Sequence, residues 1–327
     1  MTTSRRNVLI SSVALGASAL TRTSFAQDIW PSKPIRFLSA GAPGGGSDIF
    51  VRVLEPRLKE KLGQSLFIEN HPGAGGMTAA AVANSARPDG YTFFISNVAT
   101  NGIGVSLYRK PTFDPKKDLP PVGRIATFSN ALAIRADKGI NSVADLTAYL
   151  RANPKAGFFG SAGSGTSSHL SSLLYGQRIG VELTHVPYKG TAANLNGLLG
   201  GDVLFSIDNL PLYTQHVKAG TLKLLAVTKA IRSPSNPDVP TMQESGIRDF
   251  DITSWYGISA ATGTPQAIVD RMGQEIVSAL ADPDVVAKIR AIGADPAPLG
   301  PQAYAAFIQS EIQKWAPLVK ASNAMVD

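Results

Sequence analysis

The stretch from Gly160 to Leu170, GSAGSGTSSHL, concentrates residue types that could do chemistry. Glycines, hydroxyl side chains and a histidine occur together in the nucleophile turns of hydrolases, in nucleotide loops and at anion-binding helix starts. The spacing argues against the first two, because the chain has no G-x-S-x-G, no G-x-G-x-x-G and no Gly-Lys pair. The favoured interpretation is a socket for a small anion. A secreted hydrolase that uses Ser164 or Ser168 is an alternative for which no base can be assigned.

A second glycine-rich stretch, GAPGGGSD, repeats this device nearer the amino terminus. We call residues 41–48 the first turn and residues 161–168 the second turn. In each turn, an extended segment ends and a helix begins. The first N–H groups of that helix and the positive end of its dipole favour the binding of an anion. Neither turn contains Lys or Arg, which suits a small carboxylate that binds reversibly. A plain tight turn explains either one singly, but two of them favour function.

Further candidates for the pocket are polar or aromatic residues near the ends of predicted strands, where ligands bind in open α/β sheets. The segment SNVATN, residues 96–101, forms either a turn or a pocket wall. For Trp255 we favour a place in the core over a place in the pocket, since buried aromatic side chains usually belong to the core. These candidates are Ser96, Asn97, Thr100, Tyr188, Asp208 and Trp255.

The four histidines never stand at metal-ligand spacing such as H-x-x-x-H, so neither zinc nor another cofactor is expected. We expect a structural role for each histidine. His169 lies just after the second turn, where we expect it to cap or hydrogen-bond the turn, and it is counted among the ligand-binding candidates.

Extended and helical segments alternate along the chain, which predicts an α/β fold with parallel sheets covered by helices on both faces. The pattern restarts after the proline-rich segment PTFDPKKDLPPVG, and a second proline-rich segment, SPSNPDVPTM, precedes one more extended segment and two closing helices. We therefore predict one domain from residues 27–125 and 251–327 and another from residues 126–250. Two chain crossings between them would make a hinge.

Residues 1–26 have the features of an export signal: a basic start, a short apolar segment and small residues ending at Ala26. Arg5 and Arg6 favour the twin-arginine route, with an ordinary secretory signal as the alternative. Either route takes the mature chain, which would begin at Gln27, out of the cytoplasm.

Composition narrows the class of protein further. The net charge of +7 falls to +4 without the three leader arginines, and the basic residues are scattered, so no nucleic-acid partner is expected. The chain has no cysteine, which excludes disulfides and thiolate chemistry. No later segment approaches the ~18 apolar residues of a membrane span.

Taken in order, the motifs resemble the Bug or TctC type of periplasmic solute receptor, which serves tripartite tricarboxylate transporters. The resemblance covers nearly the whole mature chain. It is carried by WPSKPIRFLSAGAPGGGSD, ENHPGAGGMTAAAVANSARPDGYTFFISN, GRIATFSNALAIRAD, GSAGSGTSSHL, HVPYKGTAANLNGLLGGDVLFSIDNL, LAVT with PDVPTMQESG, and WYGISAATGTP.

The resemblance implies a two-domain clamshell without enzymatic activity or cofactor. It would bind a small organic carboxylate and pass it, as a periplasmic monomer, to the large and small membrane subunits of a transporter. Backbone amides, hydroxyls and ordered waters would hold the carboxylate. The implied binding residues are Pro43, Gly44, Gly45, Gly46, Ser47 and Asp48 in the first turn, and Ser161, Gly163, Ser164, Gly165, Thr166 and Ser168 in the second.

Two questions stay open at this point. Residues 98–101, VATN, depart from the family's more usual run of small residues with a histidine, which leaves the identity of the carboxylate open. A receptor for another solute, feeding an ATP-driven transporter, is the alternative function in the same fold class.

Overall fold

A computed structural model describes residues 30–109, 113–115, 117–234, 236–322 and 324–325. The predicted leader and its cleavage site after Ala26 lie outside the described residues. Within the described ranges, no helix combines the length and the apolar character that crossing a membrane requires.

The first part of the chain has the predicted order of strands and helices. Strand β1 pairs in parallel with both β2 and β3, because helices carry the chain back across the sheet between them. Helix α1 ends at Gly63, whose φ of 67° is the left-handed conformation that glycine adopts readily. The elements are β1 (Ile35–Ser39), α1 (Gly46–Leu62), β2 (Leu66–Asn70), η1 (Ala74–Gly76), α2 (Met77–Asn84), β3 (Thr92–Asn97), the π-helical turn η2 (Val98–Ile103) and α3 (Gly104–Leu107).

The second part repeats the alternation, and β5 pairs in parallel with β6 and β7. Its elements are β4 (Pro121–Arg135), η3 (Ala136–Lys138), α4 (Val143–Ala152), η4 (Pro154–Ala156), β5 (Phe158–Ser161), α5 (Ser167–Ile179), β6 (Thr184–Pro187), α6 (Thr191–Gly200), β7 (Phe205–Asn209), α7 (Leu210–Lys218) and β8 (Leu222–Val227).

The end of the chain is more elaborate than the predicted strand and two helices. It contains β9 (Thr253–Ala260), α8 (Gln266–Leu280), α9 (Pro283–Ala291), β10 (Asp295–Leu299) and α10 (Pro301–Ala321). Sequence reasoning missed β10, whose segment DPAPL contains two prolines, which usually exclude a central strand. Strand β10 pairs antiparallel with β4.

All of these strands hydrogen-bond into one continuous mixed sheet, with the order β2-β1-β3-β9-β4-β7-β5-β6 and with β8 and β10 also paired to β4. One parallel group, β2-β1-β3, lies at one end of the sheet, and the other, β7-β5-β6, lies at the opposite end. The antiparallel strands β4 and β9 join them. We call the two ends, each with the helices that pack on it, the first half and the second half. Strand β4 changes partners along its length: Pro121–Ser129 pairs with β9, whereas Asn130–Arg135 pairs with β7 and β8. The strands that connect the two halves are therefore part of the sheet itself.

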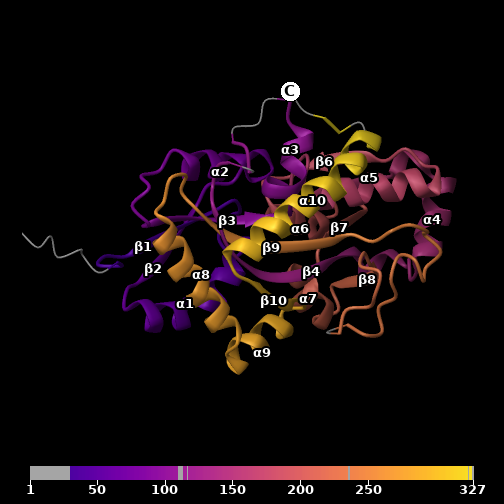
Figure 1. Cartoon of the computed structure of the whole chain (residues 1–327). Helices are drawn as coiled ribbons and strands as arrows, with labels where there is room; N and C mark the ends of the chain where they lie inside the picture. Colours follow the sequence, from indigo (N-terminus) through magenta and orange to yellow (C-terminus); the bar gives the residue numbers. More distant parts are fainter. Residues whose placement is uncertain (1–29, 110–112, 116, 235, 323, 326–327) are drawn as a thin grey trace, which may run out of the picture.

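Helices cover the sheet and bury an apolar core on each half. In the first half, α1, α8 and α9 pack around Phe50, Phe128 and Tyr256, whose rings contact one another. Helix α10 runs across the middle of the molecule in Figure 1, and its Trp315 belongs to a core cluster with Phe159 and Phe205 of the second half. The fold is thus an α/β clamshell with helices on the faces of its sheet, as predicted, but the separate, mostly parallel sheets expected for the two halves form one mixed sheet because β4 and β9 pair antiparallel between them.

Candidate functional site

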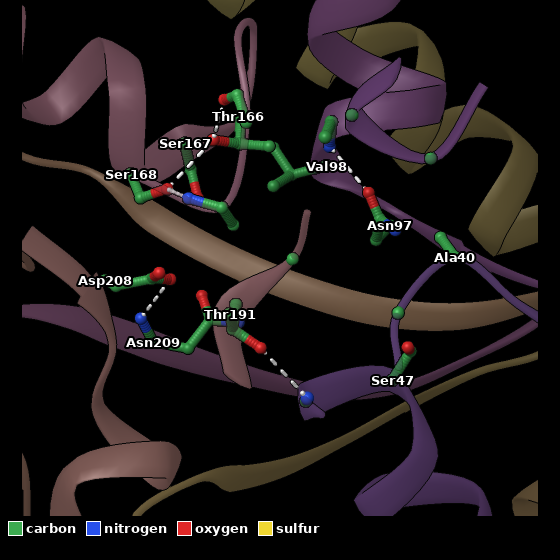
Figure 2. A pocket seen from close by; sticks show the side chains of 18 of the residues that line it. Ala40, Ser47, Asn97, Val98, Thr166, Ser167, Ser168, Thr191, Asp208 and Asn209 are labelled. Atoms are coloured by element: carbon green, nitrogen blue, oxygen red, sulfur yellow. Dashed lines mark hydrogen bonds between the residues drawn. The ribbon is translucent and has the colours of Figure 1, made fainter. Parts of the chain in front are cut away.

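A cavity of about 360 Å³ lies between the two halves, at the ends of their parallel strands. Its walls come from turns on both sides, and Figure 2 shows side chains of the two halves facing each other across it. The predicted site residues that line it are Gly46, Ser47, Asn97, Gly163, Ser164, Thr166, Ser168, Tyr188, Asp208 and Trp255.

The second turn leaves several backbone amides open toward this cavity. Thr166 caps α5 by accepting a hydrogen bond from the N–H of His169, at 3.4 Å. Among the described residues, none accepts a hydrogen bond from the N–H groups of Ser164, Ser167 or Ser168, and all three residues line the cavity. Unpaired N–H groups at the start of a helix, where its dipole is positive, form an anion-binding site.

The first turn is arranged differently, because the amides of its three adjacent glycines already have partners, and among the described residues only its Ser47 N–H faces the cavity without an acceptor. The Gly44 N–H donates to Asp48 Oδ2 at 3.0 Å, and the Gly46 N–H donates to Thr191 Oγ1 of the opposite half at 3.3 Å. The Ser47 hydroxyl is 2.8 Å from the hydroxyl of Ser39. Only Gly46 and Ser47 of this turn's candidates line the cavity.

Four predicted residues of the first turn are absent from the cavity wall. Pro43 and Gly44 are exposed at the tip, and Gly45 N–H turns inward to Ala42 O at 2.9 Å. The Asp48 side chain is buried and ion-paired with Arg52 at 2.8 Å. The structure therefore gives these residues a role in shaping the turn rather than a place beside the cavity.

Five further candidates lie behind the wall as well. Ser96 is buried against the Tyr304 hydroxyl at 2.9 Å, and Thr100 donates to Asn101 Oδ1 at 2.7 Å. Sequence position put them at the end of β3, but it could not show that their side chains turn toward the core. The other three, Ser161, Gly165 and His169, form hydrogen bonds within the second turn or to His185 behind it.

Trp255 is a core residue, as preferred from the sequence. Its indole N–H donates to Glu311 Oε2 at 2.8 Å, and its ring packs against Tyr304 and Phe307. Side chains alternate across a strand, and its neighbours Ser254 and Tyr256 also line the cavity. Trp255 thus borders the cavity through its backbone.

Sequence reasoning did not place a third glycine turn, Gly73–Gly76, at the site. A Cβ on Gly75 would lie 3.1 Å from the backbone oxygen of Ser164, so this turn and the second turn are in close contact. The repeated glycines of HPGAGG were the signal that could have found it. The other residues missed include Ala40, Tyr108, Ser167, Thr191 and Ser254.

Among the described lining residues, Asp208 and Lys189 are the only ones that carry charge. Lys189 is exposed, whereas Asp208 is buried and accepts hydrogen bonds from Asn194 Nδ2 and the Asn209 N–H, both at 2.7 Å. Burial raises the pKa of Asp208 to about 6, against the smaller opposing effect of these donors. Most of the wall is therefore neutral, made of glycine backbone, hydroxyls and aromatic rings.

The described residues contain no cluster of His, Asp and Glu that could hold a metal ion. Two histidines of the second half lie close together, but their rings stack and their nitrogens contact the second turn.

Comparison with known proteins places this geometry in a family. Residues 50–324 match the model of the tripartite tricarboxylate transporter family receptor. BugT of Bordetella pertussis is 33% identical over 298 residues, which cover 91% of each chain. A protein encoded in the tcbD-tcbE intergenic region of Pseudomonas sp. (strain P51) is 33% identical over 96% of this chain and 94% of its own.

Solved structures agree. Rpa4515 of R. palustris, described with adipate, has a TM-score of 0.87 and 35% identity over 90% of this chain and 98% of its own. MatC of Rhodopseudomonas palustris, described with bound malate, has a TM-score of 0.83 and 30% identity over 89% of this chain and 100% of its own. BugD, described as a periplasmic binding protein, has a TM-score of 0.87 and 32% identity over 90% of this chain and 99% of its own. The chain belongs to the TctC family of periplasmic solute receptors.

Proposed function

We propose that the protein binds one small organic carboxylate in the cavity between its halves and delivers it to a tripartite tricarboxylate-type transporter. The observation that carries this proposal is the start of α5, where the unpaired N–H groups of Ser167 and Ser168 border the cavity. Amides at a helix start hold an anion without a side-chain cation. The relatives described with adipate and with malate support a carboxylate as the anion.

The second turn is the main holder of the carboxylate in this proposal. Ser164 lines the cavity two residues before the N-cap and adds a third unpaired N–H group on the same turn. Hydrogen bonds to a charged acceptor contribute about 1.5–3 kcal/mol each, so several amides suffice for a ligand that must later be released. The cavity volume of about 360 Å³ suits a small organic acid rather than an oligomer.

Closure of the two halves completes the site. The hydrogen bonds that join the halves beside the cavity include the Gly46 N–H to Thr191 Oγ1, Asn209 Nδ2 to the Tyr256 hydroxyl at 3.2 Å, and the Ser254 hydroxyl to the Ser167 hydroxyl at 2.9 Å. A ligand that touches both halves stabilises the arrangement in which these contacts exist. Binding therefore selects the closed form in this proposal.

The destination of the ligand rests on family membership. We infer that the receptor acts in the periplasm as a monomer, after export through the twin-arginine route, and that its partners are the large and small membrane subunits of the transporter. The family match supports the location and the class of partner.

A ligand screen with matched amides tests the proposal. Purified protein should be stabilised by about 2.7 kcal/mol at a hundredfold excess of the cognate acid over its Kd, while the corresponding amide should have no such effect. Adipate and malate are the first acids to try, followed by other mono-, di- and tricarboxylates. Equal stabilisation by the acid and its amide would contradict an anion site, because the amide lacks the charge that the helix start attracts.

A further inference from the structure

Two histidines stack directly behind the second turn. His169 lies near the start of α5 and His185 lies in β6. The centroids of their rings are 4.0 Å apart, and the ring planes make an angle of 23°. Phe159 of β5 continues the stack on His185, at 5.0 Å. Neither histidine lines the cavity, so the binding site leaves this pair unexplained.

Each imidazole reaches the backbone of the second turn. His169 Nδ1 accepts a hydrogen bond from the Gly165 N–H at 3.2 Å. His185 Nε2 lies 2.6 Å from the Ser161 hydroxyl, which in turn accepts from the Gly163 N–H at 3.1 Å. The amides on both sides of Ser164 are therefore occupied on the histidine side of the turn. The Ser164 N–H between them has no acceptor among the described residues, and Ser164 lines the cavity.

This arrangement requires a neutral imidazole at His169. Nδ1 can accept from Gly165 only when it carries no proton, which places the ring proton of His169 on Nε2. Burial, followed by the neighbouring His185, lowers the pKa of His169 to about 3, and burial lowers that of His185 to about 4. Both rings are thus uncharged at neutral pH, and two uncharged rings can stack this closely.

We propose that His169 and His185 are positioning residues for the carboxylate-binding turn: they hold the Gly163 and Gly165 amides and thereby turn the intervening Ser164 amide toward the ligand. This inference rests on the proposed function, since it assigns the pair a role in the same site. The pair acts through the backbone and does not touch the ligand.

Paired substitutions at His169 separate positioning from simple packing. His169→Ala removes the acceptor for Gly165, whereas His169→Asn keeps an oxygen near the position of Nδ1. Affinity for adipate and malate, measured by calorimetry, should fall about tenfold in His169→Ala and recover to within about threefold of wild type in His169→Asn. His216→Ala, at a half-buried histidine of α7 away from the cavity, is the matched control and should bind like wild type.

Two results would overturn the proposal: unchanged affinity in His169→Ala, or affinity as weak in His169→Asn as in His169→Ala. If His169→Ala does not fold, His169→Asn alone decides, because it must fold and bind if the acceptor is what matters.

A measurement on the ligand-free protein keeps this test independent of the proposed function. Nitrogen NMR at neutral pH should show His169 protonated on Nε2 alone, with a coupling across the hydrogen bond between Nδ1 and the Gly165 amide. A proton on Nδ1 would refute the positioning role whether or not any acid binds. If neither acid binds wild type but this signature is present, the identity of the ligand is what has failed.

Discussion

The first and second turns have nearly the same sequence character but different surroundings. Both follow a strand, contain several glycines and precede a helix, and both lack Lys and Arg. In the first turn, Asp48 and Thr191 supply acceptors for the Gly44 and Gly46 amides, and of the cavity-lining residues there only Ser47 keeps an N–H group without an acceptor among the described residues. In the second turn, no described residue accepts a hydrogen bond from the backbone N–H groups of Ser164, Ser167 or Ser168.

The difference shows that a glycine turn predicts where an anion site can form, but not which amides stay available to the anion. That depends on acceptors contributed from elsewhere, such as Thr191, which is 145 positions away from Gly46 in the chain. It also depends on supports such as His169, which occupies one amide of the second turn and leaves its neighbour open. We expect the second turn to dominate binding and the first turn to dominate closure.

The largest expected effect comes from adding a methyl group at one glycine of each turn. Gly44 and Gly165 have similar φ values, +75° and +78°, but a Cβ on Gly44 meets nothing within 4 Å, whereas one on Gly165 would fall 1.8 Å from Leu107 Cδ2. Gly165→Ala should lower the free energy of unfolding by about 2–5 kcal/mol, from backbone strain and overpacking together. Gly44→Ala should lower it by about 1 kcal/mol, from backbone strain alone.

Denaturant unfolding of both variants measures this difference. Equal losses of stability would mean that the second turn is no more tightly packed than the first, and the contrast between the two turns would be wrong.

A smaller effect should separate the buried carboxylates of the two halves. Asp48 is paired with Arg52, whereas the donors to Asp208 are neutral amides, and burial raises the pKa of Asp208 from 3.8 to about 6. The folded protein therefore holds an extra proton between these pH values. The stability that this proton contributes is present below about pH 4 and is lost as the pH rises through about 6.

Asp208→Asn removes this titration. The unfolding free energy of wild type, measured relative to Asp208→Asn, should fall by up to about 3 kcal/mol between pH 4 and pH 7. Taking the difference cancels the titration of the histidines, which both proteins share. If the two proteins keep a constant difference across this range, Asp208 titrates as an exposed carboxyl would.

Much of the fold could be predicted because local patterns determine it. Apolar alternation and glycine punctuation located the strands from β1 to β8 and most of the helices between them. Strand β10 was missed because its pairing with β4 is a long-range contact that overrides the propensity of a proline-rich segment. The predicted domain boundaries, after residues 125 and 250, remain predictions.

The site was harder to predict than the fold. The residues of the second turn that line the cavity could be predicted, because a turn between a strand and a helix lies at the end of the sheet where the cavity forms. They are Gly163, Ser164, Thr166 and Ser168. Ser96 and Thr100 do not line the cavity, since the direction of a side chain at a strand end depends on packing against α10 and η2 that no local pattern records. The contribution of Gly75 depends on how closely the two halves approach, which is a property of the closed fold.

The central claim is that amides of the α5 helix start hold the ligand's carboxylate, and substitutions at Ser167 test it most directly. Ser167 is the first residue of α5, and Thr166 before it has φ −78° and ψ 162°, which a following proline accepts. Helices α9 and α10 already begin with proline. Ser167→Pro therefore removes one amide proton, while Ser167→Ala removes only the hydroxyl and serves as the matched control.

Calorimetric affinities of both variants for the acid that stabilises wild type give the decisive comparison. Ser167→Pro should bind about ten- to a hundredfold more weakly than Ser167→Ala, which corresponds to the loss of one hydrogen bond to a charged group. Both variants should unfold at similar denaturant concentrations. Equal affinity of the two folded variants would contradict the account, because the helix amide would then contribute nothing to holding the carboxylate.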